Sequence, residues 1–161
     1  PKYKVSFVKE STPLGTAGVL KKFIKKFKEP VFVSNSDIMI DADLIDMYNF
    51  HKKNKNEITV VASTQKYEIP YGICKLNKQG NLKTIEEKPK FNFLANTGLY
   101  IINPKILKLI PKNKKFDMTD LIKKANLIKK KIGVFPVGED SWMDIGQWNE
   151  YKFAVEKLSH N

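Results

Sequence analysis

Short apolar runs alternate with segments of helical periodicity along the first part of the chain. Val31-Phe32-Val33 is fully apolar, which is typical of central strands in a parallel sheet, and residues 58–62 predict another buried strand. We expect a further strand over residues 5–8 and a helix over residues 16–27. Asp41 can cap a second helix before the strand at 58–62. This alternation predicts an α/β fold with a Rossmann-like, doubly wound and mostly parallel sheet.

The pattern changes after residue 64. Two strands, over 71–76 and 82–87, flank the turn-forming loop 77–81 and predict a hairpin. We expect one domain over residues 1–161, with a parallel part over 1–64 and a mixed part over 65–161. The remaining expected elements are strands over 96–102 and 132–137, a short helix from Pro104, a helix capped by residues 117–120, and a closing helix over 147–158.

The net charge of +12 raises the question of nucleic-acid binding. All 29 basic residues are Lys, and Lys lacks the bidentate geometry with which Arg reads bases and phosphates. The lysines are also spread along the chain at helix-like spacing, which favours solvated helix faces. We therefore expect no nucleic-acid partner, and no apolar run is long enough for a membrane partner.

The single cysteine, Cys74, excludes an intrachain disulfide and fits a reducing, cytoplasmic location. We expect it to be a buried structural thiol, and we expect His51 to lie at the surface or at a helix end. The amino terminus has neither an initiator Met nor a signal peptide, which suggests a chain cut out of something longer. The oligomeric state stays open, a homo-oligomer included.

Two aspartates occupy suggestive positions. Asp37 follows an apolar strand, and ligands of open α/β sheets bind beyond the carboxyl ends of the strands. It can hold Mg²⁺ there, or it can equally cap a turn. Asp144 lies among large apolar residues, where a carboxylate must be paired, hydrogen-bonded or bound to a metal. It can also cap the helix expected after Gly146.

Two further segments are suggestive and individually weak. The small-residue loop at 13–18 lies between a strand and a helix, where free N–H groups favour anions or base edges. Glu87 and Lys88 could bind a sugar hydroxyl and a phosphate, although such a pair is more often surface charge. No Ser, His and Asp set stands out at catalytic spacing.

In their order along the chain, these segments resemble the sugar-1-phosphate nucleotidyltransferase family over residues 10–154. The segments that carry the resemblance are Glu10, Pro13-Leu14-Gly15-Thr16-Ala17-Gly18, Asn35-Ser36-Asp37, Tyr71-Gly72, Glu87-Lys88-Pro89, Asn96-Thr97-Gly98-Leu99-Tyr100, Asp117-Met118-Thr119-Asp120 and Trp142-Met143-Asp144-Ile145-Gly146.

The resemblance implies a reaction and a role for each segment. A sugar 1-phosphate oxygen attacks the α-phosphorus of a nucleoside triphosphate, and pyrophosphate leaves. Residues 1–64 would bind the nucleotide, and residues 65–161 the sugar phosphate. The residues so assigned are Leu14, Gly15, Thr16, Ala17 and Asp37 for the nucleotide, Gly72, Glu87, Lys88, Asn96, Thr97 and Gly98 for the sugar 1-phosphate, Asp37 and Asp144 for Mg²⁺, and Asp37, Asp144 and Lys88 for catalysis.

The chain departs from the family at two places. Ser36 stands where the family usually has Gly, and nothing matches the Gly-rich loop, bearing an Arg and a Lys, with which the family opens. We therefore expect the 161-residue chain alone to be inactive or very weak. The amino-acid sequence of the loop at 13–18 looks most like that of the guanylyl-transferring members of the family. The rival interpretations are a non-catalytic regulatory or sugar-phosphate-binding homologue and a polyanion-binding module.

Overall fold

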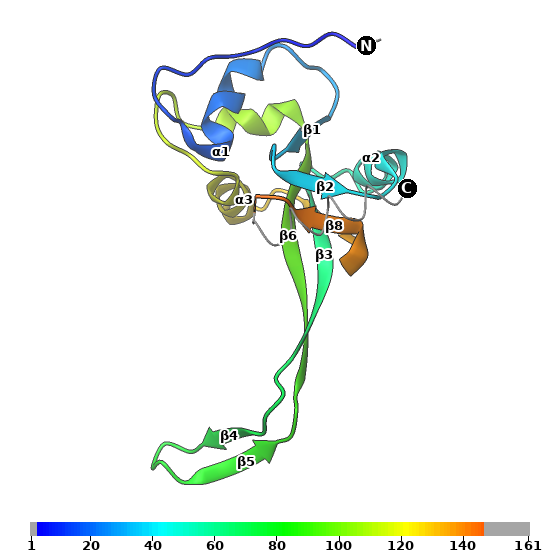
Figure 1. The fold of residues 1–161 in the computed structure, drawn as a ribbon. Coiled ribbons are helices and arrows are strands. Elements are labelled where there is room, and N and C mark those ends of the chain that lie inside the picture. Colours follow the sequence, from blue (N-terminus) through cyan, green and yellow to red (C-terminus); the bar gives the residue numbers. More distant parts are fainter. Residues whose placement is uncertain (1–2, 147–161) are drawn as a thin grey trace. The chain divides into compact units, whose positions relative to one another are not determined.

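The computed structural model describes residues 3–146 of the chain (Figure 1). The chain forms two compact units, each built from three separate segments. Unit 1 comprises Pro1–Asn35, Asp43–Val60 and Leu99–Val134; unit 2 comprises Ser36–Ala42, Val61–Gly98 and Phe135–Asn161. The expected closing helix at 147–158 lies outside the described residues.

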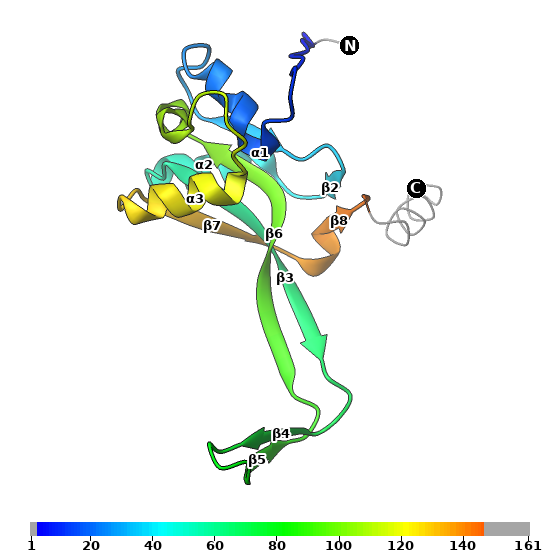
Figure 2. The same cartoon turned by 90° about the vertical axis from the view of Figure 1, so that its left-hand side faces the viewer.

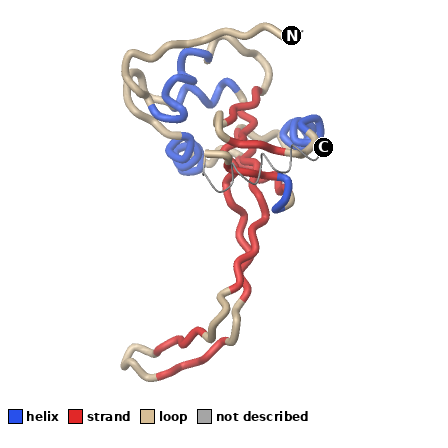
Figure 3. Tube along the Cα trace, in the orientation of Figure 1, coloured by secondary structure: helices blue, strands red, loops and turns tan. Residues whose placement is uncertain are grey.

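Most helical segments belong to unit 1, whereas unit 2 is mainly strand, as the blue and red segments of Figure 3 show. Unit 1 contains α1 (Gly15–Gly18), η1 (Val19–Phe23), β1 (Val31–Ser34), α2 (Leu44–Lys53), η2 (Pro104–Leu109) and α3 (Met118–Leu127). Unit 2 contains β2 (Ile38–Ile40), β4 (Ile73–Leu76), β5 (Leu82–Glu86), η3 (Glu139–Ser141) and β8 (Trp142–Asp144). The strands β3 (Ile58–Glu68), β6 (Lys90–Ile102) and β7 (Ile132–Val137) each contribute residues to both units.

The largest sheet has the strand order β1-β6-β3-β7. Within unit 1, β1 pairs antiparallel with the end of β6, so that Val31 lies opposite Ile102 and Ser34 opposite Leu99. Two short antiparallel pairs, β2-β8 and β4-β5, belong to unit 2. Helices and sheet strands in one chain confirm the α/β class that the sequence predicts.

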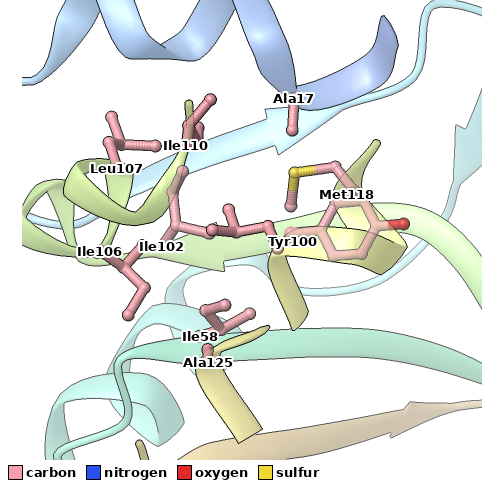
Figure 4. Close-up of a cluster of buried hydrophobic side chains, with 10 residues drawn as sticks. Ala17, Ile58, Tyr100, Ile102, Ile106, Leu107, Ile110, Met118 and Ala125 are labelled. Atoms are coloured by element: carbon pink, nitrogen blue, oxygen red, sulfur yellow. The ribbon is translucent and has the colours of Figure 1, made fainter. Parts of the chain in front are cut away.

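The core of unit 1 forms where the apolar residues of β3 and β6 meet those of the helices. In Figure 4, Ile102 and Tyr100 lie between Ala17 of α1 and Ile58, and Ala125 of α3 lies beside Ile58. Figure 2 shows α1 and α3 on the same side of β6 in this unit. Ala17 and Leu121 are fully buried in this cluster. Burial of this kind contributes about 25 cal/mol per Å² of apolar surface, so the cluster stabilises the helices on the strands.

Of two expectations for the amino-terminal segment, one is wrong and the other holds only in part. Residues 5–8 form no strand, and the Phe7 side chain is 94% exposed. An isolated strand is not stable without a partner, and this segment has none among the described residues. The helix expected over 16–27 forms only over residues 15–23, as the α-helical turn α1 followed by the 3₁₀ helix η1. Lysines four residues apart, such as Lys21 and Lys25, disfavour a longer α-helix by repulsion.

Helix α2 is capped by Asp43 and not, as we expected, by Asp41. The Asp43 carboxylate accepts hydrogen bonds from the backbone N–H groups of Ile45, at 2.6 Å, and Asp46, at 3.2 Å. Asp41 lies too early for this contact, and its own N–H donates to Ser141 O in unit 2. The cap follows the usual rule that the side chain reaches the second and third helical residues.

His51 lies in the last turn of α2, as expected, but it is only 1% exposed and is therefore not a surface residue. Its Nδ1 shares a hydrogen bond of 2.9 Å with Thr59 Oγ1. Burial lowers the pKa of the imidazole from its usual 6.5, and the neighbouring Lys52 charge lowers it further. The folded protein therefore holds His51 neutral where the unfolded chain would already protonate it.

We expect this histidine to make the chain less stable in mild acid. The unfolded chain binds a proton at this histidine near pH 6.5, whereas the folded chain does not. Protonation of the unfolded chain therefore lowers the free energy of unfolding below that pH, and no such loss occurs above it. Urea unfolding at pH 7.5 and pH 5.5 measures the loss (about one pH unit to either side of the usual pKa). His51→Gln should show a smaller difference between the two pH values, and an equal difference would contradict the assignment.

The hairpin predicted over 71–87 is confirmed as β4 and β5, joined by a turn in which Asn77 Oδ1 accepts from Gln79 N and Asn81 N. Cys74 faces Ile85 across the ladder and is exposed, so the expectation of a buried thiol is wrong. A two-stranded ribbon has two open faces, and neither face of this one is covered by other described residues of unit 2.

None of the helices between residues 3 and 146 combines the length and the apolar character that crossing a bilayer requires.

Candidate functional site

Asp37 and Asp144 come together through a strand pair that the sequence did not reveal. Strands β2 and β8 pair antiparallel within unit 2, and Asp144 lies opposite Ile38 (Figure 1). The ladder continues one residue further, because Ile145 N donates to Asp37 O at 2.9 Å. The two aspartates therefore occupy adjacent strands at the same end of this pair.

Gly146 shows how close the two carboxylates are. A Cβ atom on this glycine would lie 2.9 Å from Asp37 Oδ2 and 3.1 Å from Asp144 Oδ1. Both carboxylates therefore face one small volume that only a residue without a side chain leaves open. Asp144 Oδ1 also accepts from Gly146 N at 3.1 Å, which agrees with the cap-like contact that the sequence allowed.

The chemistry of this pair fits a hard divalent cation. Asp37 is exposed and Asp144 is half-buried, and neither forms an ion pair with a lysine of the described residues. Two carboxylates with room for water and substrate oxygens are the donor set that suits Mg²⁺. Between residues 3 and 146 no third His, Cys, Asp or Glu joins them to form a closed metal cage. Such a site would leave coordination positions for phosphate oxygens.

The loop at Leu14–Ala17 is held in unit 1 by the segment that begins α3. Leu14 O accepts from Phe116 N at 2.8 Å, and Ala17 N donates to Phe116 O at 2.9 Å. The Thr16 hydroxyl accepts from Met118 N at 2.9 Å. Together these bonds clamp the loop from both ends, so its conformation is set by residues about a hundred positions later.

Asp117 has two functions in this clamp. Its carboxylate accepts from Thr16 N at 3.0 Å. It also takes part in the capping box of α3, in which Asp117 N donates to Asp120 Oδ2 at 3.2 Å. Sequence reasoning predicted the cap and missed the bond to the loop, because only the pairing of distant segments reveals it.

Gly15 is required at its position for two reasons. Its φ of +76° is a conformation that residues with a Cβ adopt at a cost. A Cβ would also overlap Asp117 Oδ1 and would lie 2.9 Å from Phe116 O. The loop and the α3 cap therefore fit together only with glycine here.

The expected sugar-phosphate residues lie in unit 2 on both sides of the hairpin. A Cβ on Gly72 would lie 2.9 Å from Glu87 Oε2, so the glycine and the carboxylate are in close contact. Lys88 is exposed and has a φ of +44°, a left-handed conformation that is uncommon outside glycine. Strained residues of this kind cluster at functional sites.

The strand residues Asn96, Thr97 and Gly98 differ in their exposure and in their hydrogen bonds. Asn96 is exposed, and its Oδ1 accepts from Gly98 N at 3.2 Å. Thr97 is 1% exposed, its hydroxyl donates to Val61 O at 2.9 Å, and its carbonyl accepts from the Trp142 indole at 3.1 Å. The Trp142 bond ties β8, and with it Asp144, to β6 inside unit 2.

The comparisons with known proteins agree on one protein family. A family model described as nucleotidyl transferase matches residues 2–161. A probable mannose-1-phosphate guanylyltransferase of Arabidopsis thaliana is 31% identical over 157 residues, covering 92% of this chain and 46% of the relative. A mannose-1-phosphate guanyltransferase of Yarrowia lipolytica is 34% identical over 159 residues, covering 91% of this chain and 42% of the relative. The chain thus spans less than half the length of these relatives.

Solved structures agree on the fold. HddC from Yersinia pseudotuberculosis matches with a TM-score of 0.70 and 22% identity, covering 98% of this chain and 68% of that protein. The same protein complexed with GMP-PN matches with a TM-score of 0.67 and 22% identity, covering 96% of this chain and 67% of that one. This likeness confirms the Rossmann-like α/β class predicted from the sequence.

Proposed function

Because this chain belongs to the sugar-1-phosphate nucleotidyltransferase family, we propose that its protein transfers a guanylyl group from GTP to a sugar 1-phosphate. The products are a nucleotide sugar and pyrophosphate. The observation that carries the proposal is the convergence of Asp37 and Asp144 on the volume beside Gly146. Neither a turn cap nor a surface charge requires two carboxylates from distant segments to share one open volume.

Asp37 and Asp144, whose carboxylates both face Gly146, are the residues that would hold Mg²⁺. The ion, when bound, neutralises charge on the nucleotide phosphates. The chain itself holds both carboxylates at one end of the β2-β8 ladder, where phosphate oxygens could approach them. Phosphoryl-type transfer needs mainly positioning and charge neutralisation, which agrees with the missing protein nucleophile.

For the sugar 1-phosphate, Lys88 supplies the positive charge and Glu87 the hydroxyl acceptor. Gly72 leaves the Glu87 carboxylate room to approach a sugar, since any side chain at residue 72 would press against it. Asn96 and Gly98 offer polar groups on β6, and Thr97 supports them through its buried bond to Val61.

The guanine base would lie against Leu14, Gly15, Thr16 and Ala17. The bonds from Phe116, Asp117 and Met118 set the conformation of this loop, but they also use the Thr16 and Ala17 N–H groups, which are therefore not free to bind a base edge. The relatives named as mannose-1-phosphate guanyltransferases support GTP over other nucleotides. For the same reason mannose 1-phosphate is the first sugar phosphate to test.

The proposal is tested by measuring pyrophosphate release with Mg²⁺, mannose 1-phosphate and each of four nucleoside triphosphates. We expect GTP to give the highest kcat/KM in the full-length gene product, and little or no release by the 161-residue chain assayed beside it. Preference for dTTP or UTP would refute the guanylyl assignment. Binding of both substrates by the full-length product without any pyrophosphate would indicate a non-catalytic homologue.

A further inference from the structure

The hairpin formed by β4 and β5 carries a bare apolar face. Cys74 lies opposite Ile85, and Leu76 lies opposite Leu82. Directly opposed residues of an antiparallel pair share a face, and so do residues two apart on one strand, so these four side chains lie on one side of the hairpin. We call this side the apolar face. Its three large side chains are each 61–63% exposed, and the cysteine is exposed as well.

A bulge in β5 determines which residues form the apolar face. Lys75 lies opposite Thr84, so a regular ladder would place Lys83 opposite Leu76. The register shift between Lys75 and Leu76 instead makes Lys83 the extra residue of the ladder and puts Leu82 in that place. Bulges of this kind re-aim side chains and are features of a fold, not defects. The bulge therefore replaces a lysine by a leucine at this position of the face.

The opposite face of the hairpin has the polar character of a solvated surface. Lys75 Nζ and Glu86 Oε2 form an ion pair of 2.8 Å on that side, which they share with Thr84. Figures 1 and 2 show no other described element of unit 2 beside β4 and β5, apart from the ends of β3 and β6 that lead into them. The hairpin is therefore amphipathic, and none of the described residues of unit 2 covers its apolar face.

The apolar area around the hairpin is as large as one side of a protein interface. Eight large apolar side chains of this part of unit 2 are 37–74% exposed: Tyr67, Tyr71, Leu76, Leu82, Ile85, Phe91, Phe93 and Leu94. At roughly 200 Å² for each fully exposed side chain, they expose on the order of 900 Å². One partner of a standard interface buries about 800 Å². The apolar face, together with its neighbours along the chain, can therefore supply one side of an interface.

The distribution of charge favours a second copy of the chain as the partner. With a net charge of +12, two copies repel each other over most of their surface. The apolar face contains no charged residue, so two copies can approach each other there without placing lysine against lysine. An acidic partner would gain no electrostatic attraction from such a face. In a two-fold dimer the same patch contacts itself, so an uncharged face is its own complement.

We propose that two copies of this chain associate through the apolar faces of their β4-β5 hairpins. The two faces pack on each other as stacked sheets do, about 10 Å apart. Cys74 and the three large side chains of each copy are then covered by the other copy. An interface of this size is at the lower end for stable complexes, so we expect a reversible dimer with a Kd on the order of 1–100 µM. The inference is independent of the proposed function, because no residue of the apolar face is assigned to catalysis or substrate binding.

Sedimentation velocity of the 161-residue chain at about 1–500 µM tests the dimer, with a reductant present so that no disulfide joins the copies. Ile85→Glu should weaken the dimer by about tenfold or more, because each copy would bury an unpaired carboxylate in the interface. Thr84→Glu is the matched control. It changes the neighbouring exposed residue on the opposite face, and the Kd should stay within about twofold. Both variants lower the net charge by one, so the general repulsion between copies changes equally in both.

Cys74 provides a second readout, specific to the apolar face. It is the only cysteine of the chain, so its rate of reaction with a chromogenic disulfide reagent reports this face alone. We expect the rate per thiol to fall as the protein concentration rises, and to stay constant for Ile85→Glu.

Three results would overturn the proposal. The first is a chain that stays monomeric, with Cys74 reactive, up to about 500 µM. The second is a dimer that Ile85→Glu leaves intact or that Thr84→Glu weakens equally, because association would then use another surface. The third is a full-length gene product that is monomeric yet protects Cys74, because another segment of that protein would then cover the face. Neither measurement involves pyrophosphate release, so failure here and failure of the proposed function are distinguishable.

Discussion

Replacing Asp37 by asparagine in the full-length gene product is expected to lower kcat/KM for pyrophosphate release by about 10³-fold, because a bound metal ion contributes several kcal/mol to the stabilisation of developing charge. Asparagine keeps the size of the side chain but halves the negative charge beside Gly146. Asp37 is exposed and its backbone carbonyl still accepts from Ile145, so the thermal midpoint should stay unchanged. Steady-state kinetics over a range of Mg²⁺ concentrations provide the measurement.

Asp41→Asn is the matched control for this substitution. Asp41 is an exposed aspartate at the other end of the same short strand, and it loses the same charge. Its activity should remain within about twofold of the unmodified protein, as is usual for surface substitutions. Asp144→Asn should reproduce the effect of Asp37→Asn. If both aspartates could be replaced without loss of activity, the shared carboxylate site would be wrong.

The second large effect is expected for Gly15→Ala, which should destabilise the folded chain by about 3 kcal/mol. Roughly 1 kcal/mol comes from placing a Cβ at a φ of +76°, and the rest from overlap with the Asp117 carboxylate and the Phe116 carbonyl. For a chain of this size the thermal midpoint should fall by about 6–12 °C. Differential scanning calorimetry measures the shift.

Gly80→Ala separates the two causes. Gly80 has a similar φ of +84°, but a Cβ there would have nothing within 4 Å. This variant should lose only the conformational contribution, about 1 kcal/mol. Equal shifts in the two variants would show that the clamp between the Leu14–Ala17 loop and Asp117 contributes nothing to stability.

Local patterns in the sequence predicted the elements that depend on short windows of chain. The hairpin at 71–87 and the capped helix after Asp117 formed as expected, because turn residues and caps satisfy backbone groups within a few positions. The strand expected at 5–8 did not form, because a strand depends on more than its own residues. Its residues are apolar enough for a strand, but a strand also needs a neighbour, which no local pattern supplies.

Two details of α2 were predicted incorrectly from the sequence: the residue that caps it and the exposure of His51. The sequence predicted Asp41 as the cap, but α2 begins only at Leu44, so that Asp43 is the residue whose carboxylate reaches Ile45 N. His51 follows an amphipathic pattern that ends near the surface, yet Thr59 on the adjacent strand gives its ring a buried partner. The burial of His51 depends on this contact between segments.

For the site, the amino-acid sequence alone is enough to identify the candidate residues and their order along the chain. Gly15, Asp37, Glu87, Lys88 and Asp144 are each weak candidates alone, and they were singled out because their segments, in order, resemble the family. Which of them meet depends on the folded chain. The β2-β8 ladder joins Asp37 to Asp144, and the α3 cap joins Asp117 to the loop at Gly15. Such pairings are set by hydrogen-bond registers and packing between distant segments, and these interactions leave no periodic signal in either segment alone.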